Sequence, residues 1–183
     1  MNILKYTNQL INEGYIFSDK TISIDLDKFE SGSMNKLFIV GLSGSGKTTL
    51  GIHLGKVYNA EYFDTDDIPG ESDEKRLKIL KEIINRKDRT IIGGALIIKS
   101  HSRNYISSEI LMNTPVIFLG KSSLKSTLDA LIRNVKDSRD GVNKGIFRKL
   151  KVNIKKLQPM LDRFKEARIK IGGNVQELKV PRL

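Results

Sequence analysis

The residues Gly41-Leu42-Ser43-Gly44-Ser45-Gly46-Lys47-Thr48 fit the pattern G-x-x-x-x-G-K-[ST] of a phosphate-binding loop, or P-loop. This pattern is informative when it stands between a strand and a helix, and both neighbours fit. Leu37 to Val40 form a short apolar run typical of a buried strand, and Leu50, Leu54 and Val57 recur at helical spacing. The sequence therefore predicts a strand, a P-loop and a helix in this order.

Each residue type in the loop has a physical task in phosphate binding. Glycines let backbone N–H groups turn toward the phosphates, and the start of the helix offers unpaired donors. Lys47 supplies a positive charge, and the Thr48 hydroxyl can reach Mg²⁺. We predict ATP and Mg²⁺ as ligands, with Thr48 at the metal. The predicted ATP-binding residues are Gly41, Ser43, Gly44, Ser45, Gly46, Lys47, Thr48 and Thr49.

An acidic segment, Asp64-Thr65-Asp66-Asp67, follows the next apolar run, Ala60 to Phe63. We expect this run to form a strand beside the P-loop strand in a parallel sheet, where ligands bind at the carboxyl ends. Phosphoryl transfer uses one carboxylate near Mg²⁺ and one that orients or deprotonates the acceptor hydroxyl. We assign the metal to Asp64 and the acceptor to Asp66. A solvated acidic turn that caps a helix is the alternative.

The rest of the chain continues the alternation of strands and helices. Further strands are predicted over 90–92, 115–119 and 176–180, and further helices over 72–84, 100–112, 124–135 and from 150 onward, the last kinked or split at Pro159. Ile22, Ile24 and Leu26 alternate with polar residues, which predicts an early strand that we expect to pair with 176–180. The fold class is therefore α/β, a three-layer core with a parallel sheet and flanking helices.

The composition and the charge distribution exclude some classes of protein and favour one class of ligand. The 183 residues suffice for one compact domain, and the absence of cysteine excludes disulfides and thiol chemistry. The chain has no long apolar run and no signal-peptide core at its start, so we expect a cytoplasmic protein without a membrane partner. Residues 1–120 carry 15 basic and 15 acidic side chains, whereas residues 121–183 carry 17 and 6. This asymmetry favours a polyanionic ligand, the alternative being a lysine-rich solvated face.

The sequence resembles the small P-loop kinases of the shikimate kinase and adenylate kinase-like group. The resemblance rests on GLSGSGKTTLG at 41–51, YFDTDD at 62–67, IIGGA at 91–95 and VIFL at 116–119. It implies metal and acceptor binding by Asp64 and Asp66, and acceptor binding by Gly93 and Gly94. Ala95 stands in place of a third glycine, and the arginine-proline lid motif of shikimate kinases is missing, which argues against shikimate itself.

The turn-rich residues 30–33 predict a boundary between an amino-terminal β-containing extension over 1–36 and a P-loop kinase domain over 37–183. Within this domain the resemblance implies a lid region about 133–147. Arg133 and Arg139 fall in the lid region and are predicted catalytic phosphate clamps, together with Lys47 and Asp66. Each arginine has the alternative of a surface residue beside Asp137 or Asp140.

These features favour an ATP-dependent kinase that phosphorylates a hydroxyl group. The basic carboxyl-terminal third favours a nucleotide or nucleic-acid acceptor, such as a 5-hydroxymethyl-pyrimidine in DNA. A looser resemblance of Gly120 to Arg133 and of Arg139-Asp140-Gly141 to phage kinases of 5-hydroxymethyluracil in DNA points the same way. A small anionic metabolite is the alternative acceptor, and a P-loop ATPase switch or motor subunit is the alternative class. The sequence leaves the oligomeric state open.

Overall fold

The computed structural model describes residues 21–42, 44–70, 72–103, 106–120 and 153–178. Within these ranges six strands form one sheet in the order β3-β4-β2-β5-β1-β6. The strands are β1 (Ile22–Ile24), β2 (Lys36–Gly41), β3 (Glu61–Asp64), β4 (Thr90–Gly93), β5 (Val116–Leu119) and β6 (Val175–Glu177). β3, β4, β2 and β5 are parallel, whereas β1 runs antiparallel to both β5 and β6. The predicted α/β class is confirmed.

Helices cover both faces of this sheet, because its central strands are apolar on both sides. Phe38 and Val40 of β2 face one core, and Leu37 and Ile39 face the other. The helices are α2 (Leu26–Glu30), α3 (Lys47–Tyr58), α4 (Asp73–Asn85), α5 (Ala95–Arg103), α6 (Ser108–Asn113) and α9 (Gln158–Ile171), with a π-helical turn η1 (Asn153–Leu157) before α9. None of the helices in the described part of the chain is long and apolar enough to cross a bilayer.

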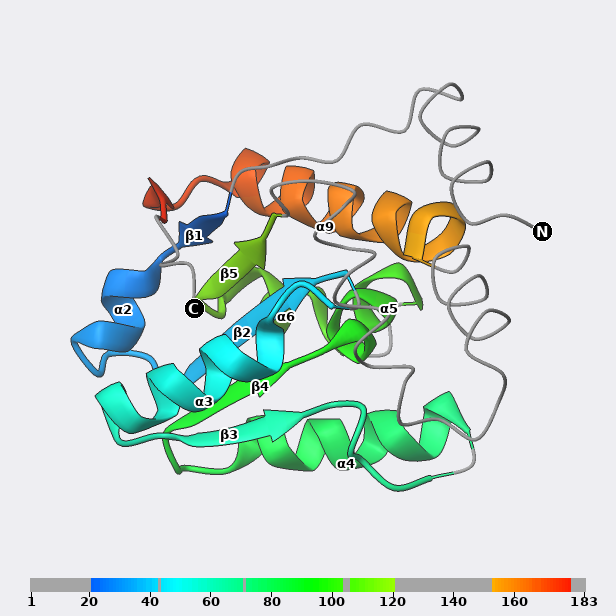
Figure 1. The fold of residues 1–183 in the computed structure, drawn as a ribbon, viewed down its shortest axis with the longest axis horizontal. Helices are drawn as coiled ribbons and strands as arrows, with labels where there is room; N and C mark the ends of the chain where they lie inside the picture. The colour runs from blue at the N-terminus through cyan, green and yellow to red at the C-terminus, as the bar shows by residue number, and fades with distance from the viewer. Residues whose placement is uncertain (1–20, 43, 71, 104–105, 121–152, 179–183) are drawn as a thin grey trace.

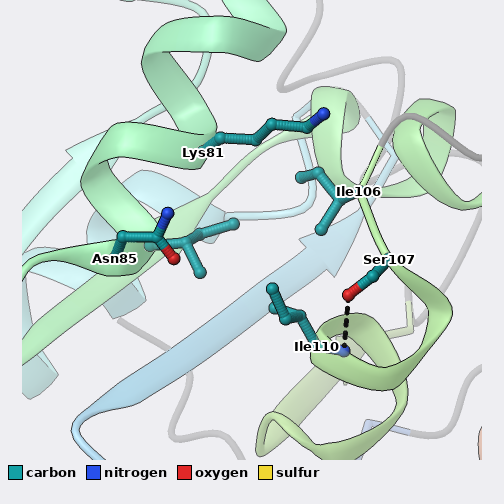
Figure 2. Close-up of a pocket in the computed structure, with 6 residues that line it drawn as sticks. Lys81, Asn85, Ile106, Ser107 and Ile110 are labelled. Atoms are coloured by element: carbon teal, nitrogen blue, oxygen red, sulfur yellow. Dashed lines mark hydrogen bonds between the residues drawn. The ribbon is translucent and has the colours of Figure 1, made fainter.

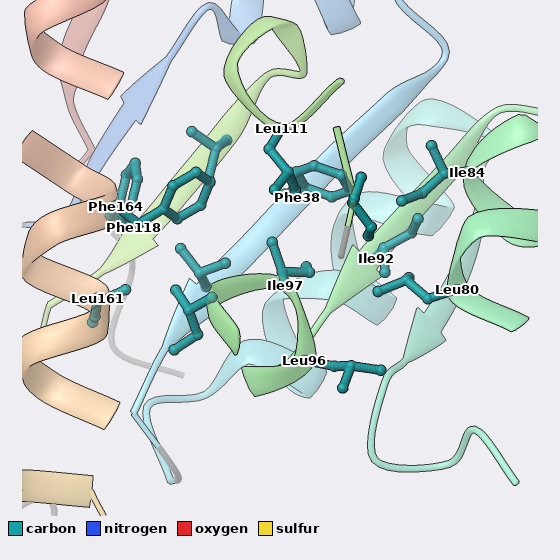
Figure 3. Close-up of a cluster of buried hydrophobic side chains, with 14 of the residues drawn as sticks. Phe38, Leu80, Ile84, Ile92, Leu96, Ile97, Leu111, Phe118, Leu161 and Phe164 are labelled. Atoms are coloured by element: carbon teal, nitrogen blue, oxygen red, sulfur yellow. The ribbon is translucent and has the colours of Figure 1, made fainter. Parts of the chain in front are cut away.

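The two cores divide the helices between the faces of the sheet. Side chains of α4, α5, α6 and α9 form the larger core, which Figure 3 shows around Phe38, Ile97 and Phe118. The smaller core lies under α2 and α3. In Figure 1, α3 crosses the near face of the sheet, α9 lies along its β5 and β1 side, and α4 lies along its β3 side. The three-layer arrangement thus holds β2 and its P-loop in the middle of the molecule.

Three sequence-based expectations differ from the structure. The predicted helix over 100–112 is two helices, because Ser107 accepts a hydrogen bond from the Ile110 N–H and starts α6 as a new helix. The first strand ends before Leu26, because Asp25 adopts a left-handed backbone with φ of 59° and Leu26 begins α2. Val57 is 58% exposed, and α3 is instead buried at Gly51 and Gly55.

The carboxyl-terminal helix changes from a π-helical turn to an α-helix next to Pro159, and Leu157 at the junction keeps a right-handed helical backbone. The π-helical turn η1 ends at Leu157, and Pro159 lies in the first turn of α9. A proline is tolerated there because its missing N–H would have no partner within the helix. Phe164 of α9 packs on Phe118 of β5, with ring centroids 5.5 Å apart. This contact packs α9 against the sheet.

The beginning and the end of the described chain meet, as expected. β1 pairs with β6, with Ile24 opposite Val175. Behind this pair, the carboxylate of Asp25 lies 3.5 Å from Arg168 of α9, and these two side chains are only 6% and 1% exposed. This first segment therefore contributes to both cores of the fold, with Ile22 and Ile24 in the larger core and Leu26 and Phe29 in the smaller. The division into an extension over 1–36 and a kinase domain stays a prediction, since 1–20 and the lid region about 133–147 lie outside the described residues.

Replacing Asp25 by asparagine tests this buried ion pair. We expect the free energy of unfolding to fall by about 3 kcal/mol at pH 7, because Arg168 keeps a buried charge without its counterion. Asparagine tolerates the left-handed backbone, so the substitution changes little else. Asp27→Asn, an exposed position in the same short helix, should change stability by less than about 0.5 kcal/mol. Urea unfolding of both variants measures the difference, and equal stabilities would contradict the prediction.

The same pair predicts a pH dependence. Burial alone would raise the pKa of Asp25, but hydrogen bonds from the Asn174 N–H and Lys28, with the charges of Lys28 and Arg168, leave this pKa below its ordinary value of 3.8. The wild-type advantage over Asp25→Asn is therefore complete above the unfolded-state pKa and is lost as the pH falls through the lower folded-state pKa. Unfolding curves at pH 7 and in acid should show this convergence.

Candidate active site

The P-loop leads from β2 into α3 through glycines with left-handed backbones. Gly44 has φ of 75° and Gly46 has φ of 89°, angles that a residue with a Cβ adopts only under strain. α3 begins at Lys47, so the N–H groups of its first turn have no partners within the helix and face the loop. Ser43 lies outside the described residues. The described part of the loop thus forms an anion cradle at the start of a helix.

The ammonium group of Lys47 lies over this cradle. Its Nζ donates hydrogen bonds to the backbone oxygens of Gly41 at 3.1 Å and Leu42 at 2.9 Å. Burial lowers the pKa of Lys47, and the nearby carboxylates of Asp66 and Asp64 act in the opposite direction. Lys47 is therefore held at the loop by carbonyl oxygens, which an anionic ligand can replace with a stronger, charge-assisted contact.

Asp64 reaches the P-loop although its strand is not beside the P-loop strand. The expectation that β3 neighbours β2 is wrong, because β4 lies between them. Asp64 can still contact the P-loop helix because β4 ends in Gly93, whose missing side chain leaves room for Tyr62 of β3. Thr48 Oγ1 donates a hydrogen bond of 2.8 Å to Asp64 Oδ2. The predicted metal residues therefore lie together.

The loop after β3 carries Asp66. The Asp66 N–H donates a hydrogen bond of 3.0 Å to Asp64 Oδ1, which couples the two acidic residues, and the side chain of Asp66 is 77% exposed. Arg76 of α4 holds this loop, since its guanidinium donates to the backbone oxygens of Thr65 and Ile68 and lies 3.9 Å from Asp66. Asp66 is thus fixed through the backbone while its carboxylate stays open to an acceptor.

Gly93 and Gly94, predicted to bind the acceptor, lie against the acidic segment. A Cβ on Gly93 would overlap the Tyr62 hydroxyl, and a Cβ on Gly94 would overlap the Thr65 side chain. The Thr65 N–H also donates a hydrogen bond of 2.7 Å to the Gly93 oxygen. Their observed role is to let the two loops approach closely, and acceptor binding stays a prediction.

The structure brings together most of the predicted site. Lys47, Thr48, Asp64, Asp66 and the glycine pair meet at the carboxyl ends of the parallel strands, whereas Arg133 and Arg139 lie outside the described residues. Sequence reasoning gave no role at the site to Tyr62 or Arg76. Without an aromatic pair near the basic region, Tyr62 indicated only a packing residue, and no residue pattern marks an arginine that bonds to backbone oxygens.

The residues present fit ATP and Mg²⁺. The Ser45 hydroxyl, within the P-loop, is buried without a hydrogen-bond partner, as expected of a group that a ligand completes. Hydroxyl and carboxylate oxygens, as in Thr48 and Asp64, are the ligand atoms that Mg²⁺ prefers. No group of three or more His, Asp or Glu side chains able to enclose a metal occurs among the described residues.

A separate recess lies at the other end of the sheet. It has a volume of about 230 Å³ between α4 and α6, and Figure 2 shows Lys81 and Asn85 facing Ile106 and Ile110 across it. A wider hollow beside it includes Lys36, at the start of β2 and therefore far from the P-loop. The walls of the recess are mainly apolar, and neither Lys47 nor Asp66, the predicted catalytic residues that the structure describes, lines it.

Comparisons with known proteins agree with this geometry. No family model matches the chain. The shikimate kinase of Histophilus somni is 27% identical over 124 residues, 56% of this chain and 71% of that protein. The shikimate kinase of Blochmanniella floridana is 31% identical over 123 residues, 57% of this chain and 62% of that protein. A shikimate kinase from Acinetobacter baumannii in complex with shikimate has a TM-score of 0.54 at 20% identity, over 78% of this chain and 94% of that one.

The chain is similar to small P-loop kinases of the shikimate kinase and adenylate kinase-like group. The predicted enzyme class, an ATP-dependent kinase with a hydroxyl acceptor that uses ATP and Mg²⁺, agrees with these relatives. They give no support to a nucleic-acid acceptor or to a phage enzyme that modifies DNA. The likeness to the solved structure confirms the fold, including its mostly parallel sheet.

Proposed function

We propose that this P-loop kinase transfers the γ-phosphoryl group of ATP to a hydroxyl group of a small metabolite. The observation that carries the proposal is the hydrogen bond between Thr48 and Asp64, with Asp66 bonded through its N–H to the same carboxylate. This arrangement sets a metal-binding pair and an open carboxylate side by side at the end of the P-loop. Phosphoryl transfer to a hydroxyl needs these two parts.

Each residue has a defined task in the proposed reaction. The P-loop N–H groups and Lys47 bind the phosphates and stabilise the negative charge on the transferred group. Thr48 and Asp64 hold Mg²⁺, which supplies charge neutralisation when bound. Asp66 orients the acceptor hydroxyl and takes its proton as the oxygen–phosphorus bond forms and the bond to the ADP oxygen breaks. Arg76 keeps the loop of Asp66 in place.

The proposed acceptor is a small molecule, and not the nucleic acid that the charge distribution of the sequence favours. The curated relatives described above are shikimate kinases, and the related structure is a complex with shikimate. The charge argument for a DNA backbone rests largely on residues 121–152, which lie outside the described residues. We therefore propose a small hydroxylated, anionic metabolite as the acceptor class.

The proposal is tested by transfer of labelled γ-phosphate from ATP with Mg²⁺. Shikimate, other hydroxy acids, nucleosides, plain DNA and hydroxymethyl-pyrimidine DNA are offered in parallel. We expect label on a small hydroxylated acid and none on DNA, and moderate salt should weaken this reaction only slightly because few ion pairs bind the acceptor. Label on DNA would favour the nucleic-acid acceptor. Label found only as free phosphate would favour an ATPase.

A further inference from the structure

Tyr62 of β3 lies in a slot made by glycines on two neighbouring elements. A Cβ on Gly51 of α3 would overlap the Tyr62 ring, and a Cβ on Gly93 of β4 would overlap the Tyr62 hydroxyl. The ring is half-buried there and joins the smaller core. Close packing in this slot therefore leaves the hydroxyl oxygen little freedom to move.

The hydroxyl at the end of this ring donates a hydrogen bond of 3.1 Å to Asp64 Oδ2. The same oxygen accepts the hydrogen bond from Thr48, and Asp64 Oδ1 accepts the hydrogen bond from the Asp66 N–H. Three donors from β3, α3 and the following loop thus set the plane of one carboxylate. A tyrosine hydroxyl carries its proton at neutral pH and is therefore a donor to this carboxylate.

The Tyr62 hydroxyl is the donor least affected by ligand binding. Thr48 and Asp66 both have proposed tasks toward the metal and the acceptor, and Asp66 lies on an exposed loop. Tyr62 instead has its hydroxyl against Asp64 and Thr48 and is held by packing against α3 and β4. It can therefore keep the Asp64 carboxylate in one orientation when the Thr48 hydroxyl turns from Asp64 toward the metal.

We propose that Tyr62 is a positioning residue whose hydroxyl holds Asp64 in the orientation that Mg²⁺–nucleotide binding requires. The inference rests on the proposed function, because it assigns Asp64 to the metal. Groups that orient a metal-binding carboxylate typically contribute 10–100-fold to metal affinity. The glycines at 51 and 93 then serve the metal site indirectly, by making room for the tyrosine.

The test compares Tyr62→Phe with Tyr58→Phe. Phenylalanine keeps the ring and removes only the hydroxyl in both variants. Tyr58 is a matched control, since its hydroxyl also donates to a carboxylate, 2.6 Å from Glu30 Oε1, at the far end of α3. Binding of a fluorescent, non-hydrolysable ATP analogue is measured over a range of Mg²⁺ concentrations and in EDTA, so no acceptor and no turnover are needed.

We expect Tyr62→Phe to raise the half-saturating Mg²⁺ concentration about tenfold and to leave the affinity in EDTA unchanged. Tyr58→Phe should match the wild type in both conditions. The inference is overturned if Tyr62→Phe keeps the wild-type Mg²⁺ requirement, or if it loses affinity equally with and without Mg²⁺, which would indicate a packing role alone.

The same measurement separates the inference from the proposed function. A wild-type protein whose nucleotide affinity does not respond to Mg²⁺ would overturn both. A wild-type protein that responds to Mg²⁺, with the expected shift in Tyr62→Phe, but that transfers phosphate to no acceptor would overturn the proposed reaction and leave the role of Tyr62 standing.

Discussion

Replacing Lys47 by alanine should lower the rate of phosphoryl transfer about 10³-fold and weaken nucleotide binding. The Nζ of Lys47 lies at the P-loop, bonded to the backbone oxygens of Gly41 and Leu42, where it meets the phosphates of a bound nucleotide. Removing one preorganised donor to developing charge costs roughly 10²–10³ in rate, and loss of a full positive charge belongs at the upper end. Initial rates with saturating acceptor, and titration with the ATP analogue, measure the two effects.

Lys56→Ala is the matched control for this variant. Lys56 lies in the last turn of the same helix and is exposed. Its replacement removes one positive charge, as Lys47→Ala does, but away from the P-loop. It should retain the wild-type rate within about a factor of two, because an exposed charge far from the reacting group is screened. If Lys47→Ala kept both affinity and turnover, the P-loop would not be the nucleotide site.

Replacing Asp66 by asparagine should lower the rate of transfer about 10³-fold with little change in ATP affinity. Asparagine keeps the size of the side chain and the N–H bond to Asp64 but cannot take a proton from the acceptor hydroxyl. General-base catalysis contributes roughly 10²–10⁴ in rate, which sets the expected size of the loss. The rate constant at saturation and the dissociation constant for ATP analogue with Mg²⁺ separate the two effects.

Two further variants are compared with Asp66→Asn. Asp67→Asn changes the neighbouring exposed carboxylate and should leave the rate nearly unchanged. Asp64→Asn should instead weaken Mg²⁺-dependent nucleotide binding, because Asp64 contacts Thr48. If Asp66→Asn lost nucleotide binding and rate equally, Asp66 would belong to the metal or nucleotide site, and the acceptor would need another base.

The core of the site was predictable because its signals are local. The glycines of the P-loop, Lys47 and Thr48 occur within eight consecutive residues whose backbone conformation and position between a strand and a helix follow from their own types. The buried strands likewise show as apolar runs, because strands covered on both faces need no polar alternation. Even Ser72, which caps α4 by accepting from the Lys75 N–H, is visible at this level.

The remaining features depend on pairing between distant segments. The sequence gives no strand order, so it placed β3 beside β2 and missed that β4 lies between them. The break between α5 and α6 was also not predicted. A serine can cap a new helix or lie within one longer helix, and packing decides between the two. The same holds for Arg76, whose partners are backbone oxygens of another element.

The sequence by itself determined the α/β class, the phosphate-binding loop and the acidic residues available for catalysis, because each depends on residues adjacent in the chain. The tertiary structure alone decided that Thr48 joins Tyr62 at Asp64 and that Asp25 meets Arg168. The contacts of Thr48 with Asp64 and of Asp25 with Arg168 join segments whose separation in the chain carries no periodic signal. Their geometry follows from strand order and close packing, which are properties of the whole fold.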